Sequence, residues 1–459
     1  MKTLTPVVAL AAVALLAAGC GRSGGDKEEP SGAGAPKQAV SADFGDLKDV
    51  CGPGSPTKAP AQGVTKDSID VGVFSDVGFT KNPELLNSAK VFTSWCNDLG
   101  GIKGRKIVPH IRDTKMMEVR QRMLESCKQD FALAGGSAAL DGLGTKDRLS
   151  CLLPDFPAQV VMVPNSGSDL QFSQTGGASY ARYQGYWGWL MKEAYPGSKG
   201  SVGIIAGDSP VTKVGAAQAQ ESLKSLGGNV AYNDLYPAQG VSDWTPYAQS
   251  IKSKGVKGLV FYGDWTSLSK LEQVLTSINY KLDWIDANNN AYLPQFIKLA
   301  GPSLKFQNNY ADLSGLHPLE TASDNPATKK IQELYAKYAS ASDLTSVGMR
   351  SFSAWLLFAK SAATCGDDLT RKCLYDAARK ETAWTAGGLQ APLDLSKSDA
   401  PLDCFNAEKA TPDGWKPADF KPNNGPYRCG EAKYKYKYTG TYGKPMTLAD
   451  VGKSMNDLK

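Results

Sequence analysis

The sequence predicts an α/β protein of two lobes, each built on a parallel sheet with helices on both faces. Short apolar runs alternate with helical patterns from residue 68 onward, and the same alternation restarts at residue 201. Two successive runs of this kind are typical of two parallel sheets with helices on both faces and right-handed crossovers. After residue 316 the pattern becomes mainly helical. These late helices are expected to pack on one of the two earlier sheets, which requires the chain to cross between the lobes more than once.

The first run opens with a predicted strand over 69–74. Asn82, Pro83 and Glu84 then supply an N-cap, a proline at the first helical position and an acidic first turn, and Gly100 ends this helix. The remaining elements of the run are a strand at 107–111, a helix over 119–131, a strand that ends before residue 135, a helix at 145–152 and a strand at 159–163.

The second run repeats the pattern of strands and helices. Its expected strands cover 201–206, 230–235, 258–262 and 282–285, and its expected helices cover 215–226, 244–254 and 267–278. Three further helices are predicted at 327–338, 346–363 and 369–380. Strict alternation of tyrosine and lysine over 434–438 predicts a half-exposed strand, with the lysines on a solvated edge.

The first 19 residues have the features of a lipoprotein signal peptide. An apolar run ends in the sequence LAAGC at 16–20, and the run is too short to cross a bilayer. We expect Cys20 to become the lipidated N-terminus, although an ordinary secretory signal with a chance cysteine is the alternative. Residues 20–63 are rich in Gly, Ser, Ala and Pro, which is typical of a flexible tether. The expected location is therefore extracytoplasmic, anchored by lipid to the outer face of the cell membrane.

Composition excludes several other classes of protein. The chain has 51 Lys and Arg against 46 Asp and Glu and no basic block interleaved with aromatic residues, so nucleic acid is not an expected partner. No cofactor is expected, and the two histidines lie far from the cysteines, which argues against a metal site. The sequence motifs of common hydrolases and nucleotide-binding enzymes are absent, so we expect a protein that is not an enzyme.

Eight cysteines remain besides Cys20, and an even number in an exported protein indicates disulfides. Short separations favour Cys365 with Cys373, Cys404 with Cys429, and Cys127 with Cys151, which leaves Cys51 for Cys96. The sequence alone does not choose among the possible pairings.

The stretch WCNDLGGIKGRKI at 95–107 resembles the helix-end signature of the type I periplasmic binding proteins, the leucine/isoleucine/valine-binding family of ABC-transporter receptors. Two glycines allow the helix to stop, and a third allows the reversal into the next strand. Further similarities follow in the family's order: AGGS at 134–137, GDS at 207–209, LVFYG at 259–263 and GGLQAP at 387–392. The sequence VCGPG at 50–54, taken with residues 95–97, is similar to the lipid-anchored actinobacterial branch.

This resemblance implies two Rossmann-like lobes joined by a three-stranded hinge, with one small solute enclosed between them. Lobe 1 would take 64–182 and 316–392, lobe 2 would take 183–315 and 393–440, and 441–459 would form a C-terminal tail. The implied function is that of a receptor for an ABC importer, which binds an amino acid or a related polar or amphiphilic solute. The implied partners are permease subunits, and we expect a monomer. A sensor or scaffold lipoprotein that signals without transport is the alternative.

In open parallel sheets, ligands bind at the carboxyl ends of the strands. Applied to the predicted strands, this rule selects a set of polar and aromatic residues that directly follow them. Besides Arg112, Asp113 and Asn290, the set comprises the residues expected to bind the solute: Ser75, Asp76, Gly136, Ser137, Asn165, Ser166, Asp208, Asp264, Trp265, Asn288 and Asn289. We expect the solute to lie between Ser137 on lobe 1 and Asp264 with Trp265 on lobe 2.

The resemblance also implies roles for some of these residues. In the family, hydroxyl and backbone N–H groups of lobe 1 hold the solute's carboxylate, and an acidic residue and an aromatic residue of lobe 2 hold its ammonium group. The N–H groups of Gly136 and Ser137 precede a predicted helix, which favours an anion, although a simple helix cap is the alternative role for Ser137. Either Asp264 or Asp286 would supply the acid. Three aromatic residues could instead stack on an apolar or ring-bearing solute: Tyr262, Trp265 and Tyr292.

Overall fold

The structure, a computed structural model, describes residues 41–175, 181–398, 400–437 and 442–459. The predicted signal peptide, Cys20 and the first half of the predicted tether lie outside these ranges. Within them, no helix combines the length and the apolar character that crossing a membrane requires.

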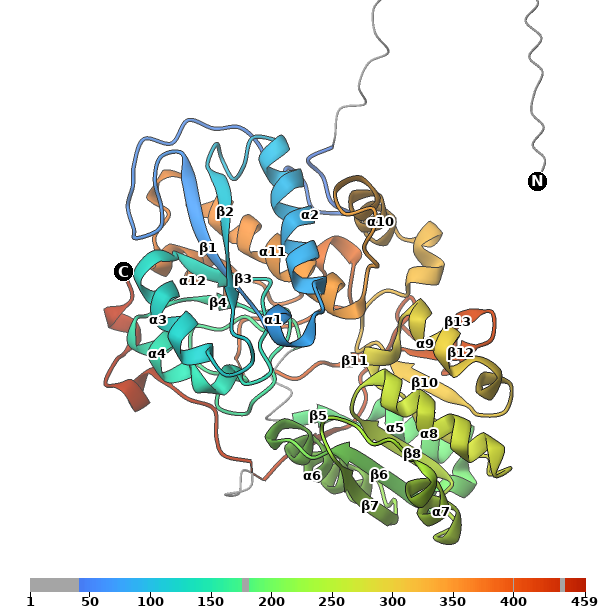
Figure 1. Cartoon of the computed structure of the whole chain (residues 1–459). Helices are drawn as coiled ribbons and strands as arrows, with labels where there is room; N and C mark the ends of the chain where they lie inside the picture. The colour runs from blue at the N-terminus through green and yellow to red at the C-terminus, as the bar shows by residue number, and fades with distance from the viewer. Residues whose placement is uncertain (1–40, 176–180, 399, 438–441) are drawn as a thin grey trace, which may run out of the picture. The chain divides into compact units, whose positions relative to one another are not determined.

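Lobe 1 is built on a parallel sheet of four strands in the order β2-β1-β3-β4 (Figure 1). The strands are β1 (Ser68–Ser75), β2 (Lys106–Asp113), β3 (Ala132–Ala134) and β4 (Asp155–Phe156). The strand predicted at 159–163 is wrong, because the backbone N–H groups of Val161 and Met162 donate to the carboxylate of Asp141 over 2.9 and 2.8 Å. These residues therefore form a turn around that carboxylate, and β4 ends before them.

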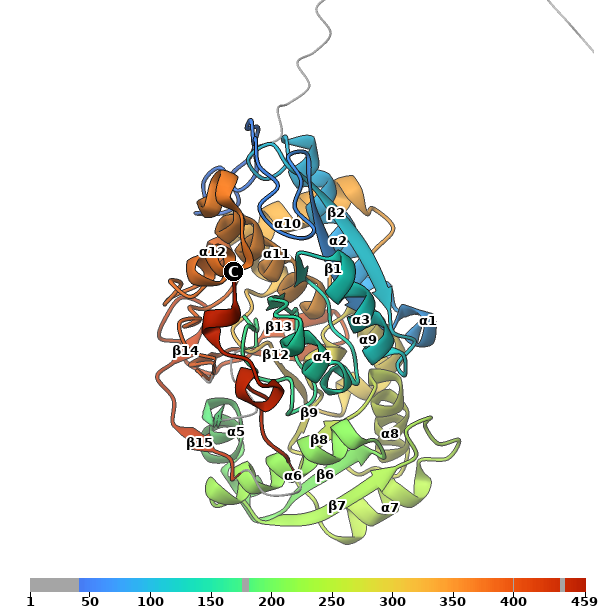
Figure 2. The ribbon, with the colours of Figure 1, turned by 90° about the vertical axis from the view of Figure 1, so that its left-hand side faces the viewer.

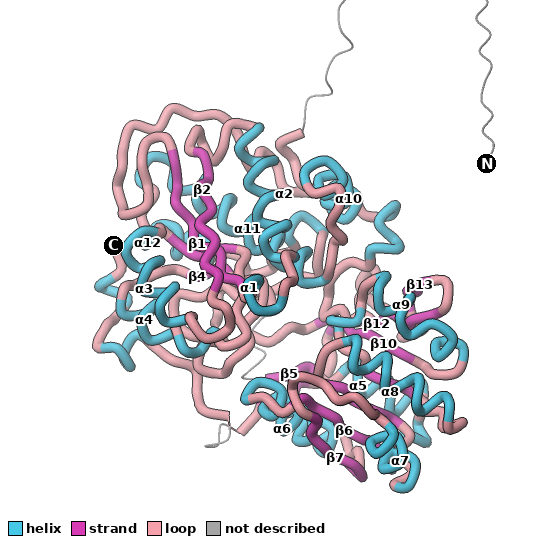
Figure 3. The backbone as a smooth tube through the Cα atoms, viewed as in Figure 1, coloured by secondary structure: helices cyan, strands magenta, loops and turns pink. Residues whose placement is uncertain are grey.

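The helices of lobe 1 come from two separate parts of the chain, 77–150 and 326–378. They are α1 (Val77–Thr80), α2 (Glu84–Asp98), α3 (Val119–Gln129), α4 (Thr145–Ser150), α10 (Pro326–Tyr338), α11 (Ser346–Cys365) and α12 (Arg371–Ala378). Helix α11 is buried, and Phe352 and Trp355 pack on Phe92 of α2 with ring centroids 5.2 and 5.6 Å apart. The expectation that the late helices return to an earlier sheet is thus confirmed (Figure 3).

Lobe 2 contains a sheet of seven strands in the order β13-β12-β10-β9-β8-β6-β7. Its parallel strands are β6 (Val202–Gly207), β7 (Val230–Tyr236), β8 (Gly258–Tyr262), β9 (Trp284–Asp286) and β10 (Asn309–Asp312). The chain returns after lobe 1 to add the antiparallel strands β12 (Ala407–Thr411) and β13 (Gly414–Pro417). Two small ladders pair β11 (Cys404–Phe405) with β14 (Arg428–Cys429), and β15 (Lys433–Lys435) with β5 (Ala181–Tyr183).

The helices of lobe 2 are α5 (Gly185–Trp189), α6 (Pro210–Ser225), α7 (Thr245–Ser253), α8 (Trp265–Ser277) and α9 (Pro294–Ala300). Helix α6 begins five residues before the predicted start because Ser209 caps it, accepting a hydrogen bond from the Thr212 N–H. In the same way, Asp264 caps α8 through the Ser267 N–H. Capping side chains of this kind satisfy N–H groups that the first turn leaves unpaired.

Both ends of the described chain pack on lobe 1. Phe44 is fully buried, with its ring 5.0 Å from that of Phe352, so the predicted flexible tether does not extend over 41–63. At the other end, Leu448 and Leu458 are buried in one apolar cluster with Leu149 of α4, and Figure 2 shows this C-terminal segment beside α4 and α12. The expected tail therefore belongs to the core of lobe 1.

All eight cysteines besides Cys20 form disulfides, and the three pairings favoured by short separation are confirmed. The bonds join Cys51 to Cys96, Cys127 to Cys151, Cys365 to Cys373 and Cys404 to Cys429. The first of them fixes the N-terminal segment to α2.

One carboxyl group is buried in the core of lobe 2. Glu272 of α8 and Asn309 of β10 are both fully buried, and the Asn309 amide donates to one Glu272 oxygen over 2.8 Å. The other carboxyl oxygen and the amide oxygen have no partner among the described residues. Burial raises the pKa of Glu272 to about 8, although the hydrogen bond from Asn309 opposes this shift. A protonated Glu272 could donate to Asn309, which would satisfy both unpaired oxygens.

We predict that Glu272→Gln removes part of the pH dependence of stability. Because the pKa of Glu272 is higher in the folded state, folding binds a proton between about pH 4.5 and pH 8, and stability falls as the pH rises through this window. The slope from one such group is at most about 1.4 kcal/mol per pH unit. Denaturant titrations across the window should show a shallower decline for the variant. Equal slopes in both proteins would contradict the assignment.

Candidate functional site

A cleft of about 740 Å³ lies between residues of the two lobes. Lobe 1 contributes 80–84, Asn87, Gln159 and the segment that leads into α11, and lobe 2 contributes Asp264, Trp265 and the region 289–295. Small-molecule sites usually occupy about 300–1,000 Å³, so the cleft has room for a small solute.

Hydrogen bonds join the lobes along one wall of this cleft. The hydroxyl of Ser346 donates to the carbonyl of Asn289 over 3.3 Å, and the amide of Gln295 donates to the carboxylate of Asp343. Tyr292 donates to Glu320 and accepts from the Leu319 N–H, 2.8 Å away. This wall therefore contains hydrogen bonds that link the two lobes.

The cleft is lined by three carboxylates and one lysine. Glu84 accepts from Thr345 over 2.7 Å and from Asn82 over 2.9 Å, and burial raises its pKa against the effect of these bonds. Burial also acts to raise the pKa of Asp264, but hydrogen bonds from Thr266 and Ser267 outweigh it and leave the pKa below its usual value. The third carboxylate, that of Asp343, accepts from Gln295, and Lys81 donates to the carbonyl of Gly78 over 2.5 Å.

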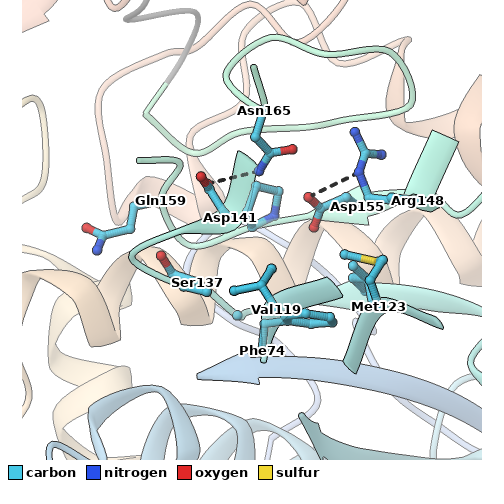
Figure 4. Close-up of a pocket in the computed structure, with 13 residues that line it drawn as sticks. Phe74, Val119, Met123, Ser137, Asp141, Arg148, Asp155, Gln159 and Asn165 are labelled. Carbon is cyan, nitrogen blue, oxygen red and sulfur yellow. Dashed lines mark hydrogen bonds and ion pairs between the residues drawn. The ribbon is translucent and has the colours of Figure 1, made fainter. Parts of the chain in front are cut away.

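A second, smaller cavity of about 30 Å³ lies inside lobe 1 (Figure 4). Phe74, Val119 and Met123 form an apolar wall, and Asp141, Asp155 and Arg148 lie across from it, with Ser137 and Gln159 at one side. Burial raises the pKa of Asp141 to about 6, against hydrogen bonds from Asn165 and two backbone N–H groups. A space of this size holds about one water molecule, so it is too small for a solute. Gln159 lines both this cavity and the cleft.

Ser137 differs from the expected anion-binding position. Its backbone N–H donates to the carbonyl of Phe74 over 3.0 Å, and no helix begins directly after it, since the next element is the short 3-10 helix Asp141–Leu143. The prediction that this N–H group is available to a carboxylate is therefore wrong. The Ser137 hydroxyl lies at the small cavity.

The structure divides the predicted site residues among several places. Asp264, Trp265 and Asn289 line the cleft, whereas Gly136, Ser137 and Asn165 line the small cavity. Asn288 borders a third space of about 100 Å³, next to Asp286 and Tyr262. The remaining four residues line none of the cavities described above. Ser75 accepts from the Val77 N–H, Ser166 is buried, and Asp208 pairs with Lys213 at the surface. The fourth is Asp76.

Sequence reasoning missed most of the lobe 1 wall. Residues 80–84 and 341–347 precede or open the helices α2 and α11. The sequence at 82–84 predicts a helix start, and no predicted strand ends there. The rule that ligands bind at the carboxyl ends of strands therefore does not select these residues. Polar residues at the starts of long helices were the signal that could have identified this wall.

Asp76 has a structural role at the end of the lobe 1 sheet. It is 8% exposed, and its carboxylate accepts from the Met116 N–H over 2.8 Å, from the Ala139 N–H over 2.6 Å and from the hydroxyl of Thr114. The same residue's carbonyl accepts from the Thr80 N–H over 2.8 Å, within α1. Asp76 thus joins the loops that follow β2 and β3 to α1, and its oxygens are occupied by these bonds.

Comparisons with known proteins agree with this architecture. The family model described as periplasmic binding protein matches residues 75–403. Among solved structures, a fatty acid ABC transporter substrate-binding protein from Thermomonospora curvata is 19% identical with a TM-score of 0.64, covering 85% of this chain and 98% of its own. A branched chain amino acid ABC transporter protein from Thermus thermophilus with bound valine is 15% identical with a TM-score of 0.63, covering 77% and 96%.

A leucine binding protein from Thermotoga maritima is 12% identical with a TM-score of 0.62, covering 76% of this chain and 97% of its own. At these identities the likeness concerns the fold, and it confirms the prediction of two Rossmann-like lobes. A comparison with curated protein sequences found no match.

We predict that Asp76→Ala lowers the free energy of unfolding by about 2–4 kcal/mol, because three donors would lose their shared acceptor in a buried place. Asp208→Ala is the control, since this carboxylate is exposed and its loss should change stability by less than about 0.5 kcal/mol. Denaturant unfolding of both variants measures the difference. Similar stability of the two variants would show that Asp76 does not hold the loops.

Proposed function

The chain belongs to the periplasmic binding protein family, and on this basis we propose that it is the lipid-anchored solute-binding receptor of an ABC importer. Members of this family bind small solutes outside the cytoplasm, work with transporter permeases and are not enzymes. The observation that carries the proposal is the cleft of about 740 Å³, which residues of both lobes line. A monomer that delivers its solute to permease subunits would account for this arrangement.

Lobe closure would couple binding to delivery. A solute that touches Asp264 and Trp265 on lobe 2 together with lobe 1 residues gains contacts in the closed form that the open form cannot offer. Only this difference in affinity shifts the population toward closure. The contacts between Ser346 and Asn289 and between Gln295 and Asp343 lie at the cleft and would change as the lobes move.

The solute is proposed to be small and polar or amphiphilic. The solved relatives include proteins named for fatty acids and for branched-chain amino acids, so the fold accepts both kinds. In the present chain, polar amides and Trp265 share the cleft with few aliphatic side chains. This lining supports a solute with several hydrogen-bonding groups.

We predict that Trp265→Ala weakens solute binding by about 1–3 kcal/mol, the usual cost of losing a large contact surface at a site. Ser137→Ala tests whether the solute also reaches the mouth of the small cavity in lobe 1. Calorimetric titration with solute extracted from the native protein measures both effects. As the control, Leu235→Ala removes a partly exposed side chain of β7 that does not line the cleft. Full affinity in a Ser137→Ala, Trp265→Ala double variant would place the solute elsewhere.

The anchor rests on the sequence LAAGC at 16–20. Cys20→Ala should abolish incorporation of labelled lipid and leave the protein unprocessed or released, because the thiol is the proposed site of diacylglycerol attachment. Detergent partitioning of wild type and variant provides the measurement. Unchanged partitioning together with unchanged labelling would contradict the anchor but not the solute-binding proposal.

A further inference from the structure

The charged groups of the cleft are mostly acidic. Glu84, Asp264 and Asp343 line it against one lysine, Lys81, so the side chains sum to three negative charges and one positive charge. Among the residues that the structure describes, none of these three carboxylates forms a salt bridge, and their partners are hydroxyl, amide and backbone N–H groups. Within the described part of the chain, no salt bridge therefore balances their negative charge.

The positions that would attract a carboxylate are already filled. The N-terminus of a helix favours an anion because its N–H groups are unpaired and its dipole is positive there. In this cleft, Asp264 caps α8, Glu84 lies in the first turn of α2, and Thr345, which caps α11, donates to Glu84. A carboxylate on the solute would have to approach next to the chain's own carboxylates.

Lys81, the single lysine of the cleft, does not make the net charge of the cleft positive. Lys81 ends α1 and donates to the carbonyl of Gly78 over 2.5 Å, at an exposed position. At Ser137, the other lobe 1 position expected to bind a carboxylate, the backbone N–H donates to the carbonyl of Phe74. The Ser137 N–H is therefore not available to a carboxylate, and Lys81 is the one cationic side chain among the described residues that line the cleft, against three carboxylates.

We propose that the cleft selects a cationic solute, an amine or guanidine that has no free carboxylate. This inference rests on the proposed function and adds the chemical class of the solute. Its ammonium or guanidinium group would donate to Asp264 on lobe 2 and to Glu84 or Asp343 on lobe 1, so the charge itself would draw the lobes together. The indole of Trp265, next to Asp264 in the same wall, offers a ring face that attracts cations.

The test compares solutes of one carbon skeleton that differ in charge. Leucine carries both groups, isoamylamine lacks the carboxylate, and isocaproate lacks the ammonium group; putrescine and agmatine add more polar cations. Thermal shift and calorimetry on the mature protein measure binding of all five at up to millimolar concentration. We expect at least one amine or guanidine to bind about tenfold or more tightly than leucine, and isocaproate to bind most weakly.

Substitutions of the cleft carboxylates test whether the preference for a cation arises in the cleft. Asp264→Asn retains a good helix cap but removes the charge, so it should weaken the bound cation about tenfold or more while the protein stays folded. Glu84→Gln and Asp343→Asn examine lobe 1 in the same way. Asp208→Asn is the matched control, because this carboxylate of lobe 2 pairs with Lys213 and lines none of the cavities described above. Its affinity should equal that of wild type.

Three results would overturn the inference. If leucine or isocaproate binds more tightly than every cation, the charge preference is wrong, while the solute-binding function stands. If a cation binds equally well to Asp264→Asn and to the double variant Glu84→Gln, Asp343→Asn, the carboxylates are not its partners. If none of the five compounds binds, the inference fails, and a screen of neutral solutes then decides whether the proposed function fails with it.

Discussion

A single buried carboxylate, that of Asp76, holds together the cleft end of lobe 1. Its two oxygens accept from the loops that follow β2 and β3, and its carbonyl accepts from the first turns of α1. Because α1 leads directly to Lys81 and to the start of α2, the lobe 1 wall of the cleft is placed by these bonds. These bonds fix the position of this wall relative to the sheet of lobe 1.

The lobe 2 wall of the cleft is positioned differently, by helices that follow the strands of its sheet. The carboxyl ends of its parallel strands lead into helices whose starts are capped by side chains, and Asp264 is both the cap of α8 and a group that lines the cleft. A residue with this double role supports the local helix and faces the solute at the same time. The cleft therefore derives its acidic character from the groups that stabilise its own walls.

The sequence predicted the two-lobed fold well because apolar periodicity and glycine positions are local signals. Most strands and the three late helices lie where the periodicity placed them, and three of the four disulfides are the pairs with short separations. The strand at 159–163 failed because Asp141, eighteen or more residues earlier, captures two of its N–H groups. The site was harder to predict. Asp76 follows a strand as a ligand residue would, yet its oxygens accept from distant loops. Glu84 lines the cleft from the start of a helix, where the rule that ligands bind at the carboxyl ends of strands does not apply.

The most direct test of this account is native mass spectrometry of the protein purified from its own host. The account predicts one small molecule bound per chain, released on unfolding, with an amine or guanidine group and no free carboxylate. It also predicts that Asp264→Asn, Trp265→Ala protein purified in the same way no longer retains this molecule. Recovery of a fatty acid or of no small molecule from wild type, or equal retention by the variant, would contradict the claim that this cleft binds a cationic solute.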